Sequence, residues 1–151
     1  MIYWFIGQPG CGKTTIARRL KSEFDAKGMA ALHLDGDDLR KIFEVPYGDR
    51  NNFSKEYRSV QTRALQRFIA HAADQGIIVI VSTVNPYRDV REEFKKSRKD
   101  VREIYVQTSD IRGREHLWAK DFEPPMENFT NLLTGCGQTE EETFKAFYHK
   151  L

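Results

Sequence analysis

A glycine-rich stretch near the amino terminus has residue types and spacing suited to binding phosphate. It runs from Gly7 to Thr14 with the sequence Gly-Gln-Pro-Gly-Cys-Gly-Lys-Thr. Such glycines let backbone N–H groups close around phosphates, the lysine reaches the β- and γ-phosphates, and the threonine hydroxyl ligates Mg²⁺. An apolar run before it and a helical pattern after it disfavour a mere glycine turn with an exposed lysine. We predict a Walker A loop whose nucleotide contacts are Gly7, Gly10, Cys11, Gly12, Lys13, Thr14 and Thr15, with Lys13 also catalytic.

Carboxylates follow the second apolar run of the chain, in the sequence Asp35-Gly36-Asp37-Asp38. Ligands of open α/β sheets bind beyond the carboxyl ends of the strands, so this turn should face the phosphate loop. Carboxylates there can hold Mg²⁺ or accept a proton from an attacking hydroxyl. We predict that Asp35 and Asp37 are catalytic and bind Mg²⁺ with Thr14, and that Asp38 caps a short helix at 39–43. Which of Asp35 and Asp37 acts as the base stays open.

Arginines and loop aromatics supply candidates for holding an anionic acceptor. Arg40, Arg58 and Arg63 carry planar guanidinium groups that suit phosphate or sulfate oxygens, although Arg63 is equally compatible with a solvated helix surface. Phe53 and Phe129 lie in predicted loops and could stack on a nucleobase. The four histidines show no metal-ligand spacing, so packing or surface roles are expected for them, His33 included.

These residues need a scaffold of alternating strands and helices. Runs rich in Ile, Val, Leu and Tyr predict buried parallel strands at 2–6, 30–34, 77–81 and 101–107. Amphipathic patterns with capping signals predict helices at 14–27, 54–75, 88–99 and 140–150. The βαβ order predicts an α/β fold: a doubly wound parallel sheet of the P-loop NTPase type with helices on both faces. Residues 44–53 and 121–138 read as irregular, and we expect a mobile lid, within about 108–138, to exclude water.

Composition narrows the class of protein. The chain has 151 residues, 40% hydrophobic and 30% charged, which suits one domain spanning 1–151. A net charge of +2 gives no reason to expect nucleic-acid or membrane binding, although a nucleic-acid partner stays open, as does a homodimer. The two cysteines are far apart, which favours reduced thiols and a cytoplasmic location. A guanine-nucleotide switch is disfavoured because neither an acidic Walker B residue nor an Asn-Lys-x-Asp motif follows the predicted strands.

Five ordered motifs resemble the adenylylsulfate kinase family, P-loop enzymes that phosphorylate the 3′-hydroxyl of adenosine 5′-phosphosulfate (APS). They are Gly7–Thr15; Asp35–Arg40, with Asp38 for the usual Asn; Phe53-Ser54 with Arg58, Gln61 and Arg63, where Gln61 replaces Asn; Asn85-Pro86-Tyr87-Arg88; and Asn128-Phe129-Thr130-Asn131-Leu132. The resemblance implies an ATP-dependent, Mg²⁺-requiring kinase of a small nucleotide-type acceptor. It implies that the acceptor is bound by Arg40, Phe53, Arg58, Gln61, Arg63, Asn85, Pro86, Tyr87, Arg88, Lys120 and Phe129.

Departures from the family pattern fall in the lid and on the acceptor side. The family's longer lid is compressed between Gln107 and Asn128, where Arg112 and Arg114 supply positive charge that we assign to the nucleotide. Asn85 replaces a serine proposed to be phosphorylated in some members, so no phosphoserine route is available there. Two alternatives therefore stay open. One is the same chemistry on another acceptor, such as a cytidine diphosphate conjugate, a sugar, a polynucleotide end or a modified DNA base. The other is a non-catalytic nucleotide-binding switch.

Overall fold

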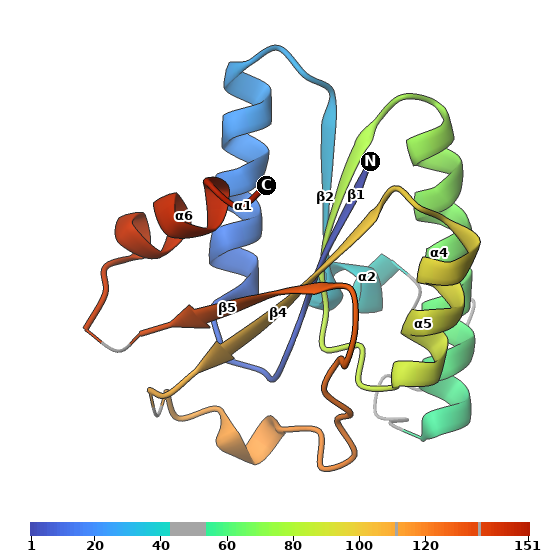
Figure 1. Cartoon of the computed structure of the whole chain (residues 1–151). Helices are drawn as coiled ribbons and strands as arrows, with labels where there is room; N and C mark the ends of the chain where they lie inside the picture. The colour runs from blue at the N-terminus through green and yellow to red at the C-terminus, as the bar shows by residue number, and fades with distance from the viewer. Residues whose placement is uncertain (43–53, 111, 136) are drawn as a thin grey trace.

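A computed structural model describes residues 1–42, 54–110, 112–135 and 137–151 (Figure 1). Its strands are β1 (Ile2–Ile6), β2 (Ala31–Asp35), β3 (Ile78–Ser82), β4 (Val101–Thr108) and β5 (Phe129–Thr134). Its helices, within the described residues, are α1 (Lys13–Ala26), α2 (Gly36–Ile42), α4 (Lys55–Asp74), α5 (Arg88–Ser97) and α6 (Glu140–Tyr148), and a 3-10 turn, η1 (Glu115–Leu117), follows β4. Within these residues, no helix is long and apolar enough to cross a membrane.

The strands form a parallel sheet in the order β2-β3-β1-β4-β5. β1 lies at the centre, with Ile2 in register with Val79 on one side and with Val101 on the other. Strands buried on both faces have near-continuous apolar sequences, as Ile-Tyr-Trp-Phe-Ile in β1 and Ile-Val-Ile-Val-Ser in β3 do. The carboxyl ends of the strands, and the loops that leave them, therefore meet at one edge of the sheet.

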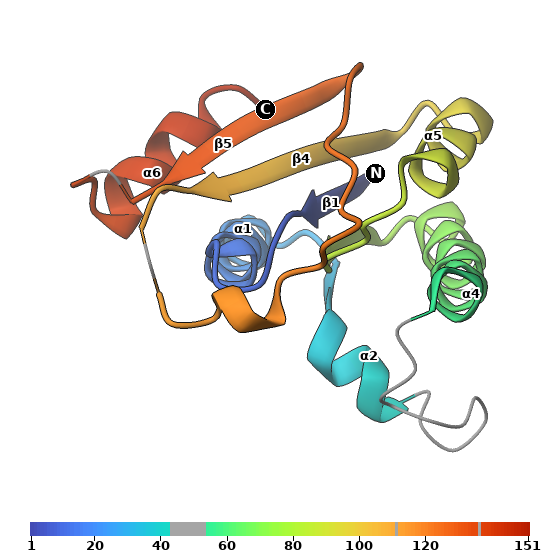
Figure 2. The ribbon, with the colours of Figure 1, turned by 90° about the horizontal axis from the view of Figure 1, so that it is seen from below.

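Helices cover both faces, which confirms the predicted doubly wound fold (Figure 2). Ile16 and Leu20 of α1 pack with Phe144 and Phe147 of α6 against one face. On the opposite face, α4 and α5 bury another apolar cluster that includes Leu65, Ile69, Trp4 and Phe94. Two separate apolar layers thus hold the central strand β1 rigidly, and with it the loop that follows.

The prediction that residues 121–138 are irregular is wrong for Phe129–Thr134, which form β5 at the sheet edge. β5 pairs with β4 from Glu103↔Phe129 to Thr108↔Thr134. Its sequence, Phe-Thr-Asn-Leu-Leu-Thr, mixes polar and apolar residues because part of this edge strand faces solvent. It therefore lacks the apolar run that predicts a central strand.

Two helix starts show how local sequence sets the boundaries. The Ser54 hydroxyl accepts a hydrogen bond from Tyr57 N at the start of α4. Thr139 and Glu142 form a capping box at the start of α6, with the Thr139 hydroxyl accepting from Glu142 N and Glu142 accepting from Thr139 N. Thr139 is therefore the N-cap of the helix that the sequence predicts from residue 140 onward.

Candidate functional site

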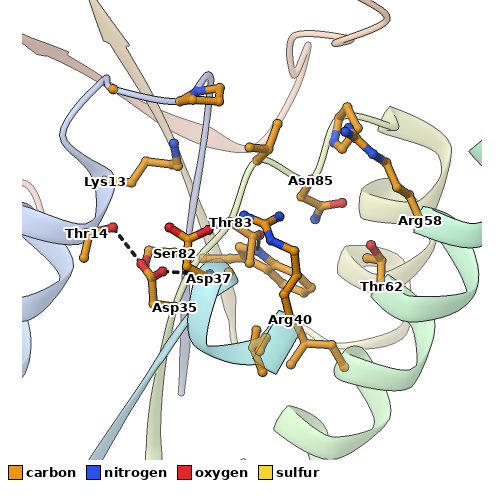
Figure 3. A pocket seen from close by; sticks show the side chains of 18 of the residues that line it. Lys13, Thr14, Asp35, Asp37, Arg40, Arg58, Thr62, Ser82, Thr83 and Asn85 are labelled. Atoms are coloured by element: carbon orange, nitrogen blue, oxygen red, sulfur yellow. Dashed lines mark hydrogen bonds and ion pairs between the residues drawn. The ribbon is translucent and has the colours of Figure 1, made fainter. Parts of the chain in front are cut away.

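A cavity of about 470 Å³ lies at the carboxyl edge of the sheet (Figure 3). Its walls come from the loop after β1, the start of α2, the first half of α4, the loop after β3 and the segment after β4. Predicted site residues that line it are Gly10, Gly12, Lys13, Thr14, Thr15, Asp35, Asp37, Arg40, Arg58, Gln61, Asn85, Pro86, Arg112 and Arg114. Segments far apart in sequence thus bring cations, carboxylates and amides to one space.

Glycines give the loop between β1 and α1 a backbone that other residues would not adopt. Gly10 and Gly12 have φ of 86° and 90°, in the left-handed region. Gly7 has φ of 142°, and a Cβ atom there would lie 2.2 Å from the carbonyl oxygen of Val106. The loop then enters α1 at Lys13, which directs the positive end of the helix dipole toward the cavity.

Lys13 is buried, and its ammonium is turned toward the loop itself. Nζ donates to the carbonyl oxygen of Gln8 at 2.8 Å and lies 3.6 Å from Cys11 Sγ. Burial lowers the pKa of Lys13, while Cys11, Asp35 and Asp37 act in the opposite direction. A desolvated cation at the start of a helix, inside a glycine loop, is an arrangement that favours an incoming phosphate.

Asp35 sits at the junction of β2 and α2 and accepts hydrogen bonds on both carboxylate oxygens. The Thr14 hydroxyl donates to Oδ2 at 2.6 Å, and the Ser82 hydroxyl donates to the same oxygen at 2.8 Å. The backbone N–H of Asp37 donates to Oδ1 at 2.9 Å. Burial tends to raise the pKa of Asp35, but these hydrogen bonds outweigh it and the pKa is lowered, so the carboxylate is ionised at neutral pH.

The bond from Asp37 N makes Asp35 the residue that caps α2, a role the sequence assigned to Asp38. Asp38 instead lies in the first turn of the helix, where it pairs with Lys41 at 3.6 Å. The helix begins at Gly36, three residues earlier than expected, because the strand runs directly into it. Asp35 therefore has a structural role as well as a position in the cavity.

Two residues that sequence reasoning did not select extend this network behind Asp35. His33 Nε2 lies 2.9 Å from Ser82 Oγ. Because the hydroxyl hydrogen of Ser82 is directed at Asp35, Ser82 accepts from His33 rather than donating to it. Burial lowers the pKa of His33, which favours the neutral ring. The only signal in the sequence was position, since Ser82 ends a strand and His33 precedes Asp35 by two residues on the same face of β2.

Asp37 and Arg40 face each other across the first turn of α2. Their side chains form an ion pair, and both line the cavity. The Asp37 carboxylate is 70% exposed, in contrast to the half-buried Asp35. Figure 3 shows Asp37 and Arg40 between the Lys13 side of the cavity and the Arg58 side.

The segment after β4 lies over the glycine loop and is bonded to it residue by residue. The Gln8 side chain donates to the carbonyl of Ala119 and accepts from its N–H, both at 2.9 Å. The Trp118 indole N–H donates to the Pro9 carbonyl at 3.1 Å, and Arg112 Nη1 donates to the Gly10 carbonyl at 3.2 Å. This places Arg112, with the neighbouring Arg114, directly beside the loop.

Several predicted acceptor residues lie away from the cavity. Arg63 is exposed on α4 and pairs with Glu93 at 2.8 Å. Tyr87 and Arg88 hold the segment before β5: the Tyr87 hydroxyl donates to Asp121, and Arg88 donates to the carbonyl of Pro124. Lys120 is exposed and does not line the cavity. Phe53 is outside the described residues.

The structure does not bring Phe129 to the cavity either. Phe129 opens β5 and pairs with Glu103 near the amino-terminal end of β4, whereas the cavity lies at the carboxyl ends. Its ring packs edge-on against Tyr105, with 6.3 Å between centroids. Of the glycine-loop predictions, Gly7 and Cys11 are buried and do not line the cavity.

The residues present fit a Mg²⁺ ion that is bound together with phosphates. Within the described ranges, no three His, Cys, Asp or Glu side chains gather as a protein-only metal site. Mg²⁺ is usually bound through one or two carboxylates together with substrate phosphates. The Thr14 hydroxyl and the ionised Asp35 carboxylate, 2.6 Å apart, with the exposed Asp37 nearby, provide such oxygens.

Comparison with known proteins identifies the family of this chain. The adenylylsulphate kinase family model matches residues 1–132. An adenylyl-sulfate kinase of Thermodesulfovibrio yellowstonii is 31% identical over 152 residues, which cover 97% of this chain and 74% of that protein. A probable adenylyl-sulfate kinase of Archaeoglobus fulgidus is 35% identical over 135 residues, covering 87% of this chain and 84% of the relative.

Solved structures share the fold. The Mycobacterium tuberculosis APS kinase CysC, in complex with AMPPNP and APS, superimposes with a TM-score of 0.79 at 22% identity. The match covers 98% of this chain and 95% of that one. The sheet and its flanking helices are therefore arranged as in that protein.

Proposed function

Because this chain belongs to the adenylylsulphate kinase family, and so is an ATP-dependent kinase with a hydroxyl acceptor, we propose that it phosphorylates the 3′-hydroxyl of APS. The observation that carries this proposal is the cavity itself. One space holds a phosphate-binding loop with Lys13 and, across Asp37, two arginines suited to an anionic acceptor, Arg40 and Arg58. A protein that only sensed nucleotide would not need the second half of this cavity.

In this proposal the glycine loop and Lys13 hold the triphosphate of ATP, with Arg112 and Arg114 beside them. Thr14 and Asp35 would hold Mg²⁺, which when bound neutralises negative charge on the phosphate oxygens. Phosphoryl transfer depends mainly on such positioning and charge neutralisation. The short, bonded segment over the loop limits the access of water to the phosphates.

We further propose that Asp37, rather than Asp35, orients the acceptor hydroxyl and takes its proton. The two oxygens of Asp35 already accept from Thr14, Ser82 and Asp37 N, and its lowered pKa makes it a weak proton acceptor. Asp37 is exposed to the cavity and lies on the side that faces Arg40. In the step, the 3′-oxygen bonds to the γ-phosphorus, the bond to the leaving ADP breaks, and the proton passes to the Asp37 carboxylate.

The test is a reaction of the purified protein with ATP, Mg²⁺ and one candidate acceptor at a time, with products identified by mass spectrometry. APS, a cytidine diphosphate conjugate, sugars, a DNA 5′-end and DNA carrying modified bases form the panel. We expect phosphate on APS, and we expect Asp37→Asn to lower kcat by about 100-fold or more while ATP binding is retained. Phosphorylation of another acceptor in preference to APS would overturn the assignment of APS as the acceptor. Full activity of Asp37→Asn would overturn the role proposed for the Asp37 carboxylate.

A further inference from the structure

Asn85 presents a buried polar group that has no partner. The residue is 6% exposed and lines the cavity, and its side-chain Nδ2 makes no hydrogen bond. Buried amide nitrogens are almost always hydrogen-bonded, because an unpaired buried donor destabilises the fold. An exception that opens onto a cavity indicates that the missing acceptor comes from a ligand.

The backbone of Asn85 is held in one conformation. Its φ is 43°, in the left-handed region. The Arg91 guanidinium donates to the Asn85 carbonyl at 2.7 Å and to Glu103 at 2.7 Å, and both of these charged side chains are buried. Pro86, also buried, restricts the chain on the other side, because its ring fixes its own φ. The loop thus fixes the backbone from which the unpaired amide projects, and unusual backbone conformations of this kind cluster at binding sites.

The neighbours of Asn85 indicate what kind of atom it would bind. Arg40 and Arg58 line the same cavity as Asn85, with Arg58 on its side, and arginine side chains only donate hydrogen bonds. Donors that converge with positive charge select a ligand oxygen that carries negative charge. Figure 3 shows Asn85 and Arg58 on the side opposite Lys13 and Thr14, so this oxygen belongs to the acceptor side and not to the triphosphate.

We propose that Asn85 Nδ2 donates a hydrogen bond to an anionic oxygen of the acceptor, a sulfate or phosphate oxygen, and so helps to determine acceptor affinity. The inference deepens the proposed function and rests on it.

The experiment compares substitutions that keep the turn but remove the donor. Asn85→Gly suits a left-handed backbone and has no amide, and Asn85→Asp keeps the shape but places a negative charge toward the anion. The matched control is Asn128, which is exposed. In the described parts of the chain, Asn85 and Asn128 are the two non-glycine residues with a positive φ. Asn128→Gly and Asn128→Asp make the same chemical changes outside the cavity.

The readouts are the calorimetric affinity for APS in the presence of ADP, which needs no turnover, and the KM values for APS and for ATP. For Asn85→Gly we expect APS affinity to fall about 10- to 100-fold and KM for APS to rise accordingly, with KM for ATP nearly unchanged. Asn85→Asp should lower APS affinity further than Asn85→Gly does. The Asn128 variants should match the wild type in both APS affinity and KM.

Three results would overturn the inference, and they can be told apart. Wild-type APS affinity in Asn85→Gly would mean that the amide serves only the backbone of the turn. A rise confined to KM for ATP would mean that the oxygen bound by Asn85 belongs to ATP, the phosphate donor. If the wild-type protein binds no APS at all, the proposed function fails and the inference fails with it.

Discussion

Lys13 shows at the scale of a single residue how the site is prepared for phosphate. Its ammonium is buried and bonded to the loop carbonyl of Gln8, and burial lowers its pKa. The cation is held by groups that carry at most partial charge, so a phosphate oxygen is a better partner than the one it has. The local structure therefore favours the ligand before the ligand arrives.

Replacing Lys13 with methionine is expected to lower kcat/KM for ATP by about 100-fold or more, because a charge that stabilises the transferring phosphate is lost. Steady-state kinetics with ATP as the varied substrate would measure this. Lys21→Met removes the same charge from an exposed turn of the same helix, where Lys21 pairs with Asp25, and should leave kinetics unchanged. Equal effects of the two substitutions would contradict the role given to Lys13.

At the scale of elements, the contact between the glycine loop and the segment that follows β4 decides how the nucleotide side of the cavity is closed. Gln8, Pro9 and Gly10 each bond to that segment, through Ala119, Trp118 and Arg112. The backbone of the loop and the arginines beside it are therefore fixed relative to each other. A short segment can do this because three consecutive loop residues contribute.

Gln8→Leu should raise KM for ATP about 3- to 30-fold, because two hydrogen bonds to Ala119 are lost and Arg112 is held less firmly. The free energy of unfolding should change less than the binding free energy, since Gln8 is only partly buried. Titration with a non-hydrolysable ATP analogue, set beside a urea unfolding curve, separates the two. A KM equal to that of the wild type would show that the contact does not bear on nucleotide binding.

The turn after β3 and the segment before β5 are joined by Tyr87, and this contact predicts a pH dependence. Burial raises the pKa of Tyr87 to about 12, and its hydrogen bond to Asp121 acts in the same direction. A folded-state pKa above the ordinary value of 10.0 means that the stabilisation is complete below pH 10 and is lost as pH rises toward 12.

We therefore expect wild type to exceed Tyr87→Phe in free energy of unfolding by a constant amount from pH 7 to about 9.5, and by a shrinking amount above that. Urea unfolding of both proteins at several pH values would measure the difference. A difference that stays constant through pH 11 would show that the Tyr87 hydroxyl is not held as described.

At the scale of the whole molecule, a buried cluster of charged side chains connects the cavity wall at Asn85 to β4 and α5. Glu103 of β4 accepts from Arg91 at 2.7 Å and from Lys95 at 2.5 Å, both on α5. Arg91 reaches the carbonyls of Asn85 and Glu123, and Lys95 reaches that of Glu127. The Glu103 carboxylate therefore holds the two cations that connect the cavity wall, α5, β4 and the chain entering β5.

Glu103→Leu should destabilise the fold by about 3–5 kcal/mol, because it leaves two cations without their buried carboxylate. Arg91→Met should cost less, since Glu103 would keep Lys95 as a partner. Urea unfolding at neutral pH gives both values, and the double variant should be more stable than Glu103→Leu alone. If Arg91→Met proved the more damaging of the two, the cluster would not depend on Glu103 in this way.

Local sequence patterns were enough to determine the phosphate loop, the parallel strands β1 to β4 and the long helices. Apolar runs, glycine positions and capping residues act on their immediate neighbours, so they can be interpreted from the residues alone. The same patterns placed Lys13, Thr14, Asp35 and Asp37 near one another, because the carboxyl ends of parallel strands share an edge.

Tertiary packing decided the rest. The mixed sequence of β5 becomes a strand only because β4 offers it an edge, and that pairing carries Phe129 away from the cavity. Asp35 rather than Asp38 caps α2 because β2 runs directly into the helix. The contact between His33 and Ser82, and the unpaired amide of Asn85, depend on side chains from separate strands and turns meeting in space. Sequence periodicity reports which face of an element is buried, but not which distant side chain will meet it there.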